Sequence, residues 1–173
     1  MNDSFFSYIQ KLEIMAFFSG YPLVYAIVQV ISGYFKGSSI FKNRMISLLP
    51  VSYVLVGILF LGLQLKKLYP DYSIDNIISE TQNPFLAFWG ILAILFFLPF
   101  LRKKVILSLL HSLVFFFLVL KNIFLYVTST NADENVLKNS MNVYTTSLAL
   151  NFSILSIVLL TVSAFNFFRK KAA

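Results

Sequence analysis

The sequence predicts an all-α, polytopic integral membrane protein whose single domain, residues 1–173, is a bundle of five transmembrane helices with short loops. Of the 173 residues, 58% are hydrophobic and 12% are charged, and one soluble core could not bury so much apolar surface. The apolar residues gather in five runs, near 14–35, 46–65, 85–101, 105–127 and 143–168. At a rise of ~1.5 Å per residue, such runs match the ~30 Å hydrocarbon core of a bilayer.

The first run, 14–35, carries its polar residues on one stripe. Tyr21, Tyr25 and Gln29 recur every four residues, and Ser32 follows three residues later, so the four side chains share one side of a helix. Polar side chains inside a membrane usually meet protein partners. We therefore expect this stripe to face another helix.

The second run, 46–65, contains Pro50 near its start and is followed by Lys66 and Lys67. A proline one turn into a helix costs little, because the first-turn amides have no helical partner anyway. We therefore expect the helix to begin close to Ile46, with Pro50 in its first turn.

The third and fourth runs, 85–101 and 105–127, form a predicted hairpin around three cations at 102–104. Pro84 suits the first turn of the third span. That span contains no charged or amide residue, and we expect its aromatic side chains, Phe96 among them, to face the acyl chains.

Polar residues of the fourth run also fall on one arc of a helix. Their positions span about 100° of a helical projection, and we expect them to face protein: Ser108, His111, Ser112, Asn122 and Tyr126. Lys121 lies off this arc, close enough to Val127 for its ammonium to reach the outer headgroups. The alternative role for Lys121 is in an ion pathway.

The fifth run, 143–168, aligns small residues along one side. These residues form the candidate helix-packing face: Thr145, Ala149, Ser153 and Ser156. Small side chains allow helix backbones to approach closely within a membrane. We therefore expect another helix to pack on this face.

The charges predict the orientation of the five spans. With the amino terminus outside and the carboxyl terminus in the cytoplasm, nine cations and no acid lie on the inner side, against four cations and all seven acids on the outer side. Short cytoplasmic loops carry an excess of Lys and Arg. The predicted location is a plasma or inner membrane, or the endoplasmic reticulum if the source is eukaryotic.

Four polar residues fall at a similar depth, roughly 10 Å inside the inner boundary at helical rise. They form a candidate intramembrane polar layer: Gln29, Tyr53, His111 and Ser163. His111 in such a layer is either a neutral side chain that bonds a neighbouring helix or a group that binds protons or substrate.

The sequence argues against most catalytic and cofactor sites. It has no cysteine and one histidine, and no acid lies inside a predicted span, so an ordinary zinc site cannot form there. No glycine-rich phosphate loop or dinucleotide motif occurs. Ser108 and Ser112, near His111, are the candidates for a nucleophile with a paired base. We predict no metal, no cofactor and no catalytic residues.

Two hypotheses for the function follow. The first is a non-enzymatic subunit or assembly partner of a larger membrane complex, which would contact another membrane protein, or itself as a homo-oligomer, within the bilayer. The second is a small oligomeric transporter or channel built around the polar layer. The formal charge of +7 lies in short clusters beside apolar runs, which is typical of topology signals near anionic headgroups and not of nucleic-acid binding.

Overall fold

The computed structural model describes residues 3–34, 39–70, 72–73, 83–128 and 134–172. This part of the chain is almost entirely helical and has no strand. The elements are α1 (Asp3–Phe18), α2 (Tyr21–Tyr34), α3 (Ser39–Lys67), α5 (Pro84–Ile91), the 3₁₀ helix η1 (Leu92–Phe97), α6 (Pro99–Arg102), α7 (Val105–Thr128) and α8 (Glu134–Ala172). The predicted all-α fold is confirmed.

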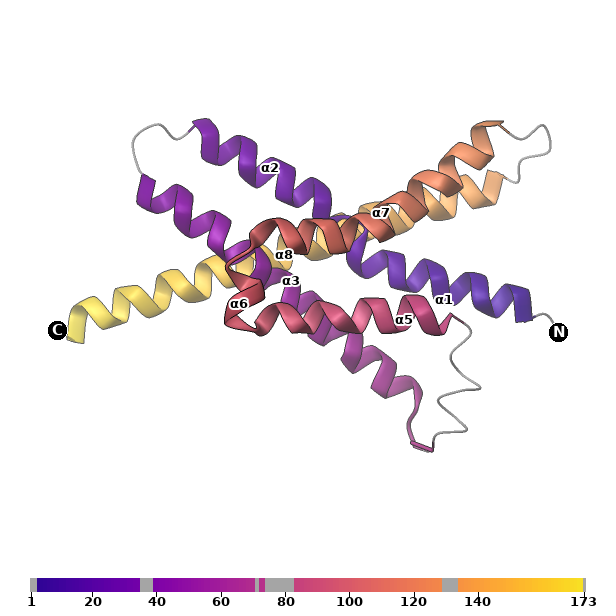
Figure 1. The fold of residues 1–173 in the computed structure, drawn as a ribbon, viewed down its shortest axis with the longest axis horizontal. Helices are drawn as coiled ribbons and strands as arrows, with labels where there is room; N and C mark the ends of the chain where they lie inside the picture. Colours follow the sequence, from indigo (N-terminus) through magenta and orange to yellow (C-terminus); the bar gives the residue numbers. More distant parts are fainter. Residues whose placement is uncertain (1–2, 35–38, 71, 74–82, 129–133, 173) are drawn as a thin grey trace.

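The helices run back and forth along the long axis of the molecule (Figure 1). The start of α1, the end of α3, the start of α5, the end of α7 and the start of α8 lie toward one end. The end of α2, the start of α3, α6 and the end of α8 lie toward the other. Within the described ranges, four helical segments are long and apolar enough to cross a membrane: Tyr8–Gly33, Asn43–Lys67, Val105–Thr128 and Asn135–Phe168.

The third predicted span, 85–101, is not a continuous helix, and a bundle of five long spanning helices is not confirmed. The α-helix stops at Ile91, a 3₁₀ helix continues to Phe97, and Leu98 is extended with φ −63° and ψ 131°. The reason for the break is Pro99, since a proline lacks an amide hydrogen and drives the preceding residue out of the α conformation. The apolar helical segment Pro84–Phe97 is therefore short.

Two further boundaries differ from the prediction. The first run is divided at Ser19 and Gly20 into α1 and α2. The second helix begins at Ser39, so Pro50 lies inside α3 and not in its first turn. The polar residues before Ile46 thus continue the helix beyond the apolar run, which the hydrophobic pattern alone did not indicate.

Aromatic side chains fill the centre of the bundle, where α1, α3 and α7 meet. The Phe18 ring lies 5.3 Å from the ring of Phe60 and 4.8 Å from that of Phe115, centroid to centroid. Phe96 of η1 is also buried, and its ring contacts Tyr53 at 5.8 Å. The expectation that Phe96 faces acyl chains is therefore wrong, because the 3₁₀ geometry turns it toward α3.

The predicted polar stripes of the first and fourth runs do face protein. Tyr21 and Ser32 are buried on α2, whereas Tyr25 and Gln29 are half-buried. On α7, Asn122 joins three buried polar residues near the start of the helix, while the neighbouring Lys121 is exposed. Helical periodicity thus identified the correct sides of both helices.

The junction between α1 and α2 crosses α8 at very short range. The Gly20 amide donates to Ser147 Oγ at 2.8 Å, and Asn151 Nδ2 donates to the Phe17 carbonyl at 2.8 Å. A Cβ atom at Gly20 would lie 2.4 Å from the Leu148 backbone nitrogen. Glycine is therefore the residue that allows the two backbones to approach here.

Candidate functional site

Five polar and aromatic residues meet in the middle of the bundle and form what we name the His111 cluster. Its members are Tyr21 of α2, Tyr53 of α3, Trp89 of α5, and Ser108 and His111 of α7. His111 is 8% exposed and Tyr53 is fully buried. The cluster includes two residues of the predicted polar layer, and its other members were not assigned to that layer from the sequence.

The imidazole of His111 bonds two different helices. Its Nδ1 lies 2.7 Å from the Tyr53 hydroxyl, and its Nε2 lies 2.8 Å from the Trp89 carbonyl oxygen. A carbonyl oxygen can only accept, so Nε2 carries the hydrogen. In the neutral ring Nδ1 then accepts from the Tyr53 hydroxyl, and this network assigns the tautomer.

Trp89 and His111 are joined reciprocally. The Trp89 indole Nε1 donates to the His111 carbonyl at 3.2 Å, and the two rings stack with centroids 4.9 Å apart and an interplanar angle of 6°. The Trp89 carbonyl belongs to the last α-helical turn before η1, where carbonyls lack an α-helical partner. The His111 ring therefore satisfies the end of α5.

Tyr21 and Ser108 extend the cluster to α2. Ser108 donates to the Val105 carbonyl at 2.7 Å, which leaves its oxygen to accept from the Tyr21 hydroxyl at 2.8 Å. The Tyr21 and Tyr53 rings lie 4.4 Å apart. The two pairs of polar side chains are therefore packed against each other through the tyrosine rings.

The cluster is chemically closed, because each polar side-chain atom in it has a partner. The candidate nucleophiles Ser108 and Ser112 both donate to carbonyls of their own helix, at Val105 and Leu109. Neither of these hydrogen bonds reaches the imidazole, so the geometry lacks the hydroxyl–imidazole bond of a nucleophile–base pair. Within the described ranges, no group of three histidine, cysteine or acidic residues is placed to hold a metal ion.

The four residues of the predicted polar layer divide into two groups. Tyr53 and His111 form a direct hydrogen bond. Gln29 lies half-buried on α2, two turns beyond Tyr21, and Ser163 is exposed on α8. A shared depth does not determine the direction in which a side chain points, and for Ser163 that direction is away from the bundle.

The predicted packing face of α8 also points away from the rest of the chain. Its four residues, Thr145, Ala149, Ser153 and Ser156, are all exposed. The buried side of α8 consists instead of Ser140, Ser147, Asn151, Ile154, Leu155 and Val158. At 100° per residue the two sides are roughly opposite. None of the four residues is buried against the described part of the chain, and a packing role toward another chain stays a prediction.

In comparisons with protein-family models, curated proteins and solved structures, none matched this chain. Two features of the geometry bear on function: the closed His111 cluster and the exposed face of α8.

Proposed function

We propose that the protein is a non-enzymatic integral membrane subunit that binds another membrane protein through the small-residue face of α8, defined by Thr145, Ala149, Ser153 and Ser156. The observation that carries this proposal is the exposure of all four residues along a helix that could span a membrane. The expected partner is a transmembrane helix with a similarly small or hydroxyl-bearing face, from a different protein or from a second copy of this chain.

The contrast with α7 supports this assignment. The exposed positions of α7 carry large apolar side chains such as Phe117, Leu120 and Phe124, which suit contact with acyl chains. On α8, where large side chains such as Leu160 are also exposed, the four positions of the face carry hydroxyl or methyl groups, which leave room for a second backbone and can hydrogen-bond across a helix pair. Lipid contact alone does not require small residues at these four positions.

The alternative function, a small oligomeric transporter or channel, has less support from the geometry. Tyr53 and His111 use their polar atoms on each other and on Trp89, and Ser163 lies on the outside of α8. A conducting layer needs polar groups that can face an ion or a substrate. The hydrogen bonds of the closed cluster instead hold α3, α5 and α7 together.

The exposed face of α8 makes a direct prediction about assembly. Ala149→Leu and Ser156→Leu should each reduce co-purification of a membrane partner from mild detergent by about tenfold, because leucine holds the backbones apart. Thr161→Leu is the matched control, since Thr161 is exposed on another side of the same helix. The thermal stability of the isolated chain should not change in any of the three. Equal recovery of partner with all three variants would refute the proposed contact face.

We further propose that the α5–η1–α6 segment is a fifth crossing, with the amino terminus outside and the carboxyl terminus in the cytoplasm. The Asn83 amide, at its start, bonds Gln10 Oε1 of α1 at 2.7 Å, whereas Arg102, at its end, lines a cavity with Ser47 of α3. Eight α-helical and six 3₁₀ residues rise ~24 Å at about 1.5 and 2.0 Å each. That length approaches the ~30 Å core of a bilayer.

Single cysteines test this topology, because the chain has no cysteine of its own. An impermeant thiol reagent applied from outside should label Ser73→Cys and Asn131→Cys, and should label Ser39→Cys and Lys104→Cys only after the membrane is permeabilised. Labelling of Ser73→Cys and Lys104→Cys from the same side would eliminate the fifth crossing. Labelling of Ser39→Cys from outside would invert the orientation.

A further inference from the structure

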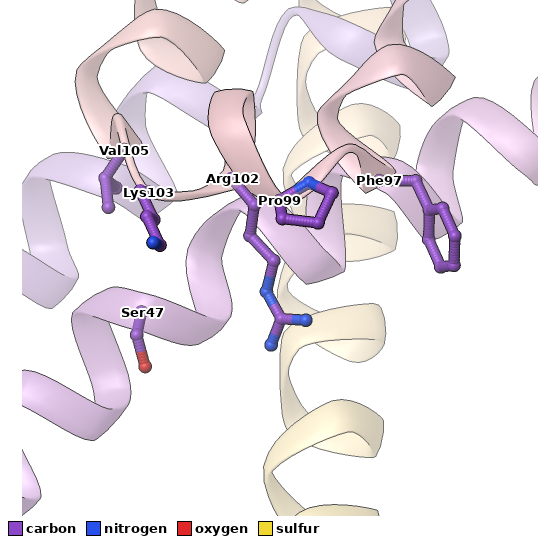
Figure 2. Close-up of a pocket in the computed structure, with 6 residues that line it drawn as sticks. All are labelled: Ser47, Phe97, Pro99, Arg102, Lys103 and Val105. Atoms are coloured by element: carbon purple, nitrogen blue, oxygen red, sulfur yellow. The ribbon is translucent and has the colours of Figure 1, made fainter.

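A cavity of about 440 Å³ opens where the third segment breaks. Its lining combines two cations, one hydroxyl and three apolar side chains: Arg102, Lys103, Ser47, Phe97, Pro99 and Val105. In Figure 2 the Arg102 side chain, at the end of α6, and the Lys103 side chain, in the turn that follows, both extend toward the side where Ser47 of α3 lies. Small-molecule sites in proteins usually have volumes of roughly 300–1,000 Å³.

The backbone explains why the cavity is at this place. Leu98 is extended and Pro99 begins the short helix α6, so the chain changes direction between η1 and α7 and cannot fill the space beside α3. The Lys104 carbonyl accepts from the Leu107 amide at 2.9 Å as α7 begins. The positive end of this 24-residue helix lies at the cavity, next to Val105, and adds to the attraction for an anion.

The two cations of the cavity have no acidic partner within the described residues. Glu13 is the one acid whose side chain is described, and it pairs with Lys67, which ends α3 far from Ser47. Lys104 is directed elsewhere, with its Nζ 4.9 Å from the centre of the Phe100 ring. Among the described side chains, none offsets the positive charge that Arg102 and Lys103 present to the cavity.

We propose that this cavity binds the phosphate group of an anionic lipid headgroup in the leaflet at the α6 end of the bundle. Arg102 can donate to two phosphate oxygens at once, and Lys103 adds a second positive charge. Phe97, Pro99 and Val105 provide apolar contacts for the glycerol and the first part of an acyl chain. Ser47 Oγ donates to the Arg44 carbonyl at 2.8 Å, so its oxygen can accept from a headgroup hydroxyl. Phosphatidylglycerol has both an anionic phosphate and a headgroup hydroxyl.

The experiment measures lipid binding to the purified full chain by native mass spectrometry. The chain is kept in mild detergent with equal amounts of phosphatidylglycerol and phosphatidylcholine. The wild type should retain phosphatidylglycerol selectively. Arg102→Gln/Lys103→Gln should weaken that retention by roughly 30-fold, because each basic group near an anionic surface contributes about fivefold. The matched control, Lys170→Gln/Lys171→Gln, removes the same charge from the end of α8, a helix that contributes no residue to the cavity lining, and should retain the lipid.

Three results would overturn the proposal. The first is equal retention of both lipids by the wild type, and the second is an equal loss of phosphatidylglycerol from the two double variants. The third is displacement of phosphatidylglycerol by millimolar inorganic phosphate, which would indicate a site for free phosphate. Thermal unfolding of the cavity variant provides the folding check. If that variant unfolds at a lower temperature than the wild type, the phosphate competition is repeated with the wild type and with the charge-conserving variant Arg102→Lys/Lys103→Arg. This comparison does not depend on a loss of charge.

Discussion

Gly20→Ala should lower the free energy of unfolding by about 3 kcal/mol, the upper part of the range for overpacked sites. The added Cβ would lie 2.4 Å from the Leu148 nitrogen and 2.6 Å from the Leu148 Cα and the Ser147 carbonyl carbon. These are backbone atoms of α8 and cannot move aside by a change of rotamer. Separation of the helices would also break the bond from the Gly20 amide to Ser147 Oγ.

The control for this prediction is another glycine to alanine change. A Cβ at Gly62 of α3 would meet no heavy atom within 4 Å, so Gly62→Ala should be neutral or stabilising, because alanine favours a helix over glycine by up to ~1 kcal/mol. The measurement is thermal unfolding in detergent, monitored by circular dichroism. If the Gly20→Ala variant is as stable as the Gly62→Ala variant, the backbone at Gly20 does not approach α8 as closely as described.

His111→Leu should cost about 2–3 kcal/mol of stability, because it leaves the Tyr53 hydroxyl and the Trp89 carbonyl without their partner. His111→Gln should cost less, because an amide both donates and accepts. Ser112→Ala should be mild, since Ser112 bonds a carbonyl of its own helix. Thermal unfolding of the three variants in the same detergent assay measures this order of stability.

A double-mutant cycle separates the pair from general damage. In His111→Leu/Tyr53→Phe the unpaired hydroxyl is also gone, so the double variant should lose about 1 kcal/mol less than the sum of the two single variants. Strict additivity would mean that Tyr53 and His111 do not bond. A His111→Leu chain with unchanged stability and a changed ion flux in proteoliposomes would favour the transporter hypothesis.

The fourth run was predicted well from the sequence because its pattern has one interpretation. Ser108, the adjacent pair His111 and Ser112, and Asn122 lie on one side of the helix, and apart from Lys121 the residues between them are large and apolar, so the polar side is distinct and is expected to face protein. The same condition holds for Tyr21 and Ser32 of the first run. Periodicity gives the direction of a side chain where one side of the helix differs clearly from the other.

The fifth run lacks this contrast, and the sequence did not identify the side of α8 that packs within the chain. Small or polar residues occur on both sides, Ser147 and Asn151 on one and Ala149 and Ser153 on the other. The choice depends on a tertiary contact, the approach of Gly20 to Ser147 and Leu148. The adjacent small residues Ser19 and Gly20 were the available signal for that contact.

The third run shows how composition can conceal a break. Seventeen mostly apolar residues from 85 to 101 match a membrane span by length, but Pro99 lies inside them and requires an extended residue before it. That break was predictable. The 3₁₀ geometry of η1 was not, because it accompanies close packing on α3, where a Cβ at Gly57 would lie 3.0 Å from the Ala93 Cβ.

We propose that the small-residue face of α8 contacts protein while the exposed side of α7 contacts lipid. The most direct measurement is photo-crosslinking in native membranes from a benzophenone group attached to a single cysteine, at Ser153→Cys on α8 or at Phe117→Cys on α7. Both native residues are exposed. We expect a discrete protein adduct from position 153 and lipid adducts alone from position 117. Lipid adducts alone from both positions would contradict it.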